Sequence, residues 1–225
     1  RDYRKPFPRN SIAPTGNPES SEDGVTWRRI KIQGRFRNLL GQLLFLAANE
    51  AWKHQEGPVN FSIPVDLRSR IPGTRSTGNL SIAIYVEVRQ DSTPESLTQD
   101  IRSQLEEKHD CLIDKGDYLI THLPLKLLVN RGRSMIKKVN SSGRYGTSGA
   151  FSHMGQVPLD VFSGGAFTAT TFWGIPPGFE TIPFFLGSAC AEDSIEIILT
   201  MPAALASNGR LEQVLNNIST GLRKS

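Results

Sequence analysis

Two alternating runs of apolar residues constrain the fold more than any other feature of this sequence. In residues 59–65 and again in residues 80–88, apolar side chains occupy every second position. Such alternation is typical of β-strands that bury one face and expose the other. Pro72, Gly73 and Gly78 lie between the two runs and indicate a turn. We therefore predict two strands, in sequence order, joined by this turn.

Helical spacing flanks these strands. Apolar residues recur at intervals of three and four from Phe36 to about His54, which predicts a helix that ends before Gly57 and Pro58. Three further helices are expected: one beginning at Pro94 with Ser92 or Thr93 as its cap, one over residues 117–139 that Pro124 can break, and one capped by Ser207 or Asn208 that buries Leu211, Val214, Leu215 and Ile218.

Further strands are expected over residues 147–157, 166–173, 182–188 and 195–201. Trp27, Ile30 and Ile32 are interpreted as a short lead-in to the first helix. The order of elements is helix, two strands, helices, several strands and a last helix. This order predicts an α/β domain with a mixed sheet and helices packed on it.

Residues 1–24 are rich in Pro, Gly, Ser and Asn, which predicts a linker or lobe-crossing segment ahead of a domain over residues 25–225. Because the first residue is Arg1, we expect a processed chain or a piece of a longer one. The net charge of +4 is mild, with a small basic cluster at Arg1, Arg4, Lys5 and Arg9. This pattern is typical of a solvated surface and argues against nucleic-acid binding.

Two cysteines, Cys111 and Cys190, cannot form a disulfide framework, which favours a reducing, cytoplasmic compartment. No apolar run is long enough to span a bilayer, and no signal peptide is expected. None of the four histidines belongs to a metal-type pair, so no metal site is expected. His54 and His109 lie near helix ends, where a positive charge is favourable. Phosphate-loop, dinucleotide and nucleophile-elbow motifs are absent.

Two local patterns remain. The first is Ile-Pro-Val-Asp-Leu-Arg at residues 63–68, followed by Thr-Gly-Asn-Leu at residues 77–80. The second is Phe-Ser-His-Met-Gly at residues 151–155, followed by the strand expected over 166–173. Each pattern alone has an ordinary structural interpretation. An arginine at the end of a buried strand usually forms a structural ion pair, and a Ser-x-x-Gly run at a strand end is usually a turn. Their order along the chain is more specific than either pattern.

In that order they resemble the C-terminal lobe of the chloramphenicol acetyltransferase-like superfamily, which includes condensation domains, alcohol acetyltransferases and polyketide-associated acyltransferases. The resemblance covers about residues 27–222. It implies one lobe of a two-lobed fold of the kind found in CoA-dependent acyltransferases, with an active-site tunnel between the lobes. His153 stands where the family motif usually has Asn, which departs from the pattern.

In the resembled family the other lobe carries His-His-x-x-x-Asp-Gly, whose second His is the general base. This motif is absent from the chain, so no catalytic residue is expected here and the isolated chain is expected to be inactive. The resemblance implies that Ser152, His153 and Gly155 line the tunnel on the substrate side. It also implies that Arg68 forms a structural ion pair with the missing lobe and that Gly78 and Asn79 shape the turn.

The resemblance further implies a donor thioester on acyl-CoA or a phosphopantetheinyl arm, no covalently bound cofactor, and an N-terminal catalytic lobe and a small-molecule acceptor as partners. The product would be an ester or amide in natural-product or lipid biosynthesis. The alternative interpretation is a non-catalytic interaction module derived from this fold.

Overall fold

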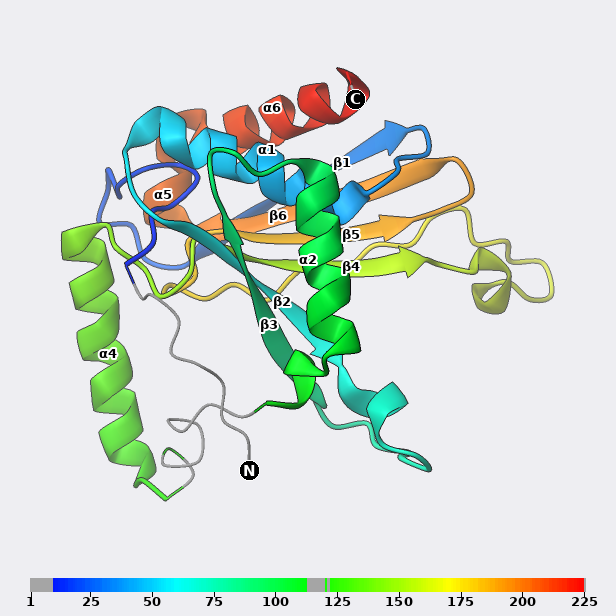
Figure 1. Cartoon of the computed structure of the whole chain (residues 1–225), viewed down its shortest axis with the longest axis horizontal. Helices are drawn as coiled ribbons and strands as arrows, with labels where there is room; N and C mark the ends of the chain where they lie inside the picture. Colours follow the sequence, from blue (N-terminus) through cyan, green and yellow to red (C-terminus); the bar gives the residue numbers. More distant parts are fainter. Residues whose placement is uncertain (1–9, 113–119, 121, 225) are drawn as a thin grey trace.

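The computed structural model describes residues 10–112, 120 and 122–224, which form a mixed sheet with helices packed on it (Figure 1). Six strands lie in the order β1-β6-β5-β4-β2-β3. Their bounds are Val25–Gln33 (β1), Val59–Asp66 (β2), Ser81–Val88 (β3), Gly149–Gln156 (β4), Phe185–Cys190 (β5) and Ser194–Pro202 (β6). β2, β4 and β5 run parallel to one another, and the other neighbours are antiparallel. The predicted α/β fold class is confirmed.

Helices α1, α2 and α6 pack over one face of this sheet, with α1 packed against both α2 and α6 (Figure 1). The helices are Leu39–His54 (α1), Pro94–Glu106 (α2), Leu125–Ser142 (α4), Ala203–Ala206 (α5) and Arg210–Lys224 (α6), and the short 3-10 turns are Leu67–Arg70 (η1), His109–Cys111 (η2), Leu159–Phe162 (η3) and Ser207–Gly209 (η4). α2 begins where the sequence predicts, because Thr93 and Ser96 form a reciprocal capping box and Pro94 occupies the first turn.

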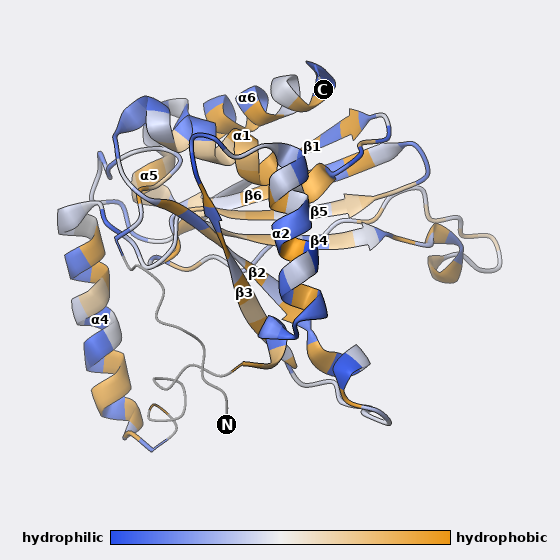
Figure 2. Cartoon of the chain, in the orientation of Figure 1, coloured by the Kyte–Doolittle hydropathy of each residue, from blue (hydrophilic) through white to orange (hydrophobic). Residues whose placement is uncertain are grey.

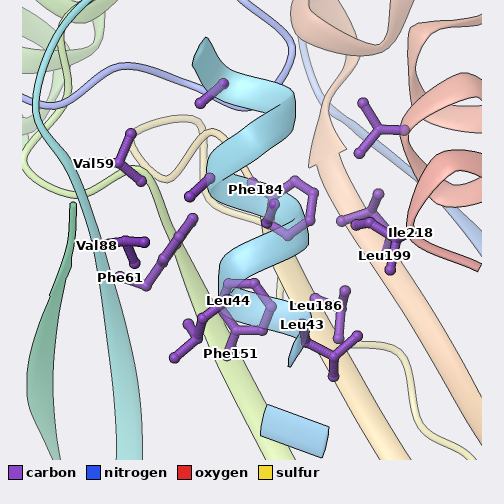
Figure 3. Packing of buried hydrophobic residues seen from close by; sticks show 14 of the residues in the cluster. Leu43, Leu44, Val59, Phe61, Val88, Phe151, Phe184, Leu186, Leu199 and Ile218 are labelled. Atoms are coloured by element: carbon purple, nitrogen blue, oxygen red, sulfur yellow. The ribbon is translucent and has the colours of Figure 1, made fainter. Parts of the chain in front are cut away.

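The main core lies between α1, α6 and the sheet (Figure 3). Leu43 and Leu44 of α1 point toward Phe61, Phe151 and Leu186 on three neighbouring strands, and all five side chains are fully buried. The rings of Phe61 and Phe151 meet edge to face at 4.9 Å. Packing of this kind follows from the predicted strand alternation, which gives each strand one apolar face.

β6 is buried at every position, so its second face is covered as well. Figure 2 shows that the central strands are predominantly apolar in colour. The cover on the second face, called here the outer face, is an irregular segment over residues 171–178, called here the outer strap. Thr171 donates to Glu196 of β6 at 2.8 Å, and Thr200 of the same strand donates to the Pro176 carbonyl at 3.1 Å.

Three expectations from the sequence are corrected. Residues 25–33, interpreted as a lead-in to the first helix, form edge strand β1, which pairs with β6 along its whole length. Only Ile32 of β1 is buried, so the strand carries a weak apolar signal. Residues 166–173 form no strand apart from an isolated bridge between Gly164 and Phe167, because this region lies in the connection that runs into the strap.

The third correction concerns helix limits. The helix expected over residues 117–139 extends to Ser142, and α4 begins directly after Pro124, the position where a break was expected; residues 113–119 and 121 of the expected range and its surroundings lie outside the described part. α1 begins at Leu39 rather than Phe36, since Asn38 adopts a left-handed conformation. The last helix begins at Arg210, after the turn that contains Ser207 and Asn208.

The described part of the predicted linker, residues 10–24, packs on the domain. Ser11 pairs with Tyr145 through two backbone hydrogen bonds, and the side chain of Ile12 is fully buried. Arg210 donates to the carbonyls of Thr15 and Asn17 at 3.0 and 2.8 Å. The basic cluster at residues 1–9 lies outside the described residues. Within the described residues, no helix has the length and hydropathy needed to cross a membrane.

Candidate functional site

The carboxyl ends of β2, β4 and β5 lie at one edge of the sheet, because these strands are parallel. Ligands of open α/β sheets commonly bind outside the carboxyl ends of such strands. Both motifs from the sequence reach this edge, one at the end of β2 and the other within β4. We therefore take the carboxyl edge as the candidate site.

The sheet opens between β2 and β4 toward this edge. The two strands pair only at Phe61 with Gly149 and at Ser62 with Ala150 among the described residues. The Asn60 carbonyl accepts from Ser148, so the backbone of Asn60 faces β4, and by alternation the backbone of Pro64 faces the same way. Proline has no N–H to donate, so the ladder cannot continue there. Pro64 thus explains why the two strands separate.

Ser152 and His153 of β4 point to opposite faces of the sheet, because successive side chains of a strand alternate. His153 lies on the same face as Phe151, and its Nδ1 is 2.9 Å from Oγ of Ser188 on β5. Burial lowers the pKa of His153 below its usual value, so the neutral ring is favoured near pH 7. The arrangement provides a neutral, oriented imidazole rather than a fixed positive charge.

Gly155 lies where the pairing of β4 with β5 changes register, between His153 and Gln156. Its φ of 69° is in the left-handed region, which glycine adopts without steric cost. Such irregularities re-aim side chains at sheet edges. Next to Gly155, the Met154 side chain is 57% exposed at the edge.

Arg68 lies in η1, directly after β2, and holds the following loop. Its guanidinium pairs with Asp66 at 2.9 Å and donates to the carbonyls of Ser76 and Gly78 at 3.2 and 2.7 Å. The backbone N–H of Arg68 also donates to Asp66, and this bond lowers the pKa of the Asp66 carboxyl. Ser81 donates to the Asn79 side chain at 2.7 Å, which closes the turn.

The predicted site residues thus form two groups at the same edge: Ser152, His153 and Gly155 on β4, and Arg68, Gly78 and Asn79 beside β2. Among the described residues, no hydrogen bond or ion pair connects the two groups. The tunnel-lining role of the first group and the pairing of Arg68 with another lobe stay predictions.

Sequence reasoning missed a pocket of about 200 Å³ on the outer face, beside Ser152. Its walls come from strands β4, β5 and β6 and from the outer strap: Ser152, Met154, Phe185, Gly187, Ser188, Ala189, Ile198, Gly174, Ile175, Pro176 and Pro177. The run Gly-Ile-Pro-Pro-Gly at residues 174–178 is incompatible with a helix or a central strand. It was the one sequence feature that could have indicated an irregular segment lying over the sheet.

The described part of the chain contains no group of three or more His, Cys, Asp or Glu side chains placed to hold a metal ion. Both cysteines are free. Burial raises the pKa of the Cys190 thiol at the end of β5, which disfavours the reactive thiolate.

Comparison with solved structures relates this architecture to known folds. The starter condensation domain of the rhizomide synthetase RzmA matches with a TM-score of 0.51 and 9% identity, over 89% of this chain and 46% of that one. A condensation domain that mediates chain release from the enacyloxin polyketide synthase matches with a TM-score of 0.53 and 13% identity, over 96% and 44% of the two chains.

The chain has the chloramphenicol acetyltransferase-like fold. The nonribosomal peptide synthetase FmoA3 matches as well, with a TM-score of 0.53 and 11% identity, over 95% of this chain and 24% of that one. The acyltransferase-like fold expected from the two motifs is therefore confirmed. The chain spans less than half the length of each of these structures. No protein-family model and no curated protein matches the sequence.

Proposed function

We propose that this chain is the C-terminal half of a thioester-dependent acyltransferase or condensation-like enzyme. One observation carries the proposal: nearly the whole chain aligns with less than half of two condensation-domain structures. The general-base motif His-His-x-x-x-Asp-Gly is absent from the 225 residues. In this proposal the base is supplied by a second lobe, which belongs to the same parent chain or to a separate one.

The proposed reaction transfers an acyl group from acyl-CoA or a phosphopantetheinyl arm to a hydroxyl or amine. The acceptor attacks the thioester carbonyl while the base of the other lobe takes its proton. The carbon–sulfur bond then breaks, the thiol leaves with a proton, and an ester or amide forms. A cytoplasmic enzyme of natural-product or lipid biosynthesis fits this chemistry.

This chain would supply the acceptor-side wall of the tunnel. Ser152, His153 and Gly155 reach the carboxyl edge, where the opening beside Pro64 gives access between β2 and β4. A neutral His153, held by Ser188, can orient a substrate by hydrogen bonding without adding a charge. Arg68 would turn from Asp66 to a carboxylate of the other lobe, because a guanidinium that becomes buried needs a charged partner.

The test compares this chain alone with this chain joined to the region encoded upstream of it. Thioester consumption is followed with a thiol reagent for short and long acyl-CoA donors. The expected result is no turnover by the isolated chain and turnover by the joined protein. Turnover by the isolated chain that survives His153→Ala would overturn the proposal. A joined protein that binds acceptors without turnover would instead favour the non-catalytic interaction module.

A further inference from the structure

The outer-face pocket has a composition that selects for one class of ligand. We propose that it binds the aliphatic chain of an acyl group. This inference rests on the proposed function for one point, namely that a thioester carries that chain. Of the residues that line the pocket, only Ser152 and Ser188 have polar side chains, and the Ser188 side chain lies with His153 on the opposite, helix-covered face of the sheet. The Ser188 hydroxyl is already hydrogen-bonded to His153.

A charged group would be disfavoured in this pocket. It would lose its hydration, and no lining side chain carries an opposite charge. An aliphatic chain loses nothing by leaving water and contacts Phe185, Ile198 and Ile175 instead. Within the described residues the Ser152 hydroxyl has no hydrogen-bond partner, and its place on the pocket wall suits a carbonyl at the end of the chain.

The pocket is held in shape by the way the outer strap is attached. Thr171 donates to Glu196, and Arg29 donates to both carboxylate oxygens of Glu196 at 2.8 and 2.9 Å while stacking 4.7 Å from the Trp173 ring. These contacts lie just before the part of the strap that forms the pocket wall. A preformed wall needs little ordering on binding, which favours affinity for a small ligand.

Gly187 fixes the depth of the pocket. A Cβ at this position would lie 2.8 Å from Cγ of Pro176, so only glycine lets the strap approach β5 this closely. Thr200 holds the same strap residue through the Pro176 carbonyl. The strap and the strand are therefore in direct contact on one side of the pocket.

The size of the pocket indicates that only part of a molecule enters. Its volume of about 200 Å³ is below the roughly 300–1,000 Å³ of sites that enclose a whole drug-sized ligand. Met154 and Ile175 line it and are 57% and 49% exposed, so they form its rim. The remainder of a bound thioester would extend past Met154 along the carboxyl edge, where the candidate site lies.

Binding is tested on the full chain without any other lobe, so its outcome is independent of whether the proposed acyl transfer occurs. The probes are N-acetylcysteamine thioesters from acetyl to octanoyl, titrated by calorimetry and by NMR of the Met154, Ile175 and Ile198 methyl groups. Affinity should rise about fourfold per added methylene and then level off when the pocket is full. Absence of this chain-length dependence, or shifts confined to other methyl groups, would overturn the proposal.

Free fatty acids of the same lengths form a second series. Tighter binding of the thioester identifies a thioester-borne chain as the ligand. Equal binding shows that the aliphatic chain alone is recognised and that a free acid is as good a source. A series in which only the free acids bind would contradict the proposal, because it would require a cationic partner that the lining lacks.

Two matched pairs of variants locate the site. Ser152→Phe should fill the pocket and remove the chain-length dependence, whereas Ser141→Phe on α4 should leave it intact. Ile175→Ala, which thins the wall, should weaken octanoyl binding severalfold, whereas Ile71→Ala at a similarly exposed position (45%) should not. If Ser152→Phe fails to fold, the isoleucine pair decides. Equal effects within both pairs would show that the chain binds elsewhere.

Discussion

At the scale of single residues, His153 departs most from the motif that the sequence resembles. Its Nδ1 faces Ser188, and burial lowers its pKa. The folded-state pKa therefore lies below the unfolded value of about 6.5. Between these two values the unfolded state binds more protons than the folded state, so the free energy of unfolding falls as the pH drops below about 6.5.

We therefore expect the free energy of unfolding of His153→Asn to fall less than that of the wild type as the pH drops below about 6.5. Urea unfolding at intervals from pH 5 to pH 8 measures it, and for one proton the slope cannot exceed about 1.4 kcal/mol per pH unit. His54→Asn, at the exposed end of α1, is the control and should follow the wild type. A wild-type protein equally stable throughout this range would show that the folded protein accepts a charged His153.

Arg68 offers a second residue-scale prediction. Its guanidinium holds the Ser76 and Gly78 carbonyls, but its pair with Asp66 is exposed. Exposed pairs contribute little to stability. Arg68→Ala should therefore leave the melting temperature of the isolated chain almost unchanged while amide exchange in residues 74–80 accelerates. Arg75→Ala in the same loop is the control. A large loss of melting temperature would mean that Arg68 supports the core of this chain.

At the scale of elements, α1 and α2 meet at a glycine. A Cβ on Gly41 would collide with the Pro94 carbonyl and the Thr98 hydroxyl of α2, whereas a Cβ on Gly132 of α4 would meet nothing. Gly41→Ala should cost at least about 1–3 kcal/mol through overpacking. Gly132→Ala should add about 0.5–1 kcal/mol, because alanine favours a helix interior. Urea denaturation measures both, and equal effects would exclude a close helix crossing at Gly41.

Periodicity predicted the elements that bury one regular face: α1, α2, α6, β2 and β3. It failed for β1, because an edge strand with the exposed arginines Arg28 and Arg29 carries no alternating signal. It failed for the strap as well. Thr171 and Trp173 are residue types common in strands, but here they pack on the outer face and pair with no strand among the described residues.

The candidate site was predictable to the extent that motifs mark strand ends. The sequence placed Arg68 at the end of one strand and Ser152 and His153 within another, and the parallel strands bring both motifs to one edge. The opening beside Pro64, the Ser188 partner and the outer-face pocket depend on which strands become neighbours. That information arises only when the sheet forms, because β4 and β5 pair across the long connection over residues 157–184.

At the scale of the whole molecule, the connection between β4 and β5 projects from the carboxyl edge (Figure 1). It exposes large apolar side chains that a monomeric domain usually covers: Val161 is 67% exposed, Phe162 49% and Phe167 65%. Clustered exposed apolar residues mark interaction surfaces. Under the proposed function, this projection is part of the surface that the catalytic lobe covers.

Phe167→Asp should therefore weaken association with the separately produced upstream region without lowering the melting temperature of this chain. Loss of one buried Phe side chain corresponds to about 1.5–3 kcal/mol, which is at least a tenfold change in Kd. Leu125→Asp is the control, because Leu125 is 75% exposed and its helix α4 lies on the opposite side of the molecule from the projection (Figure 1). Calorimetric titration compares the two variants with the wild type. If both bind the upstream region as the wild type does, the projection is not part of the lobe interface.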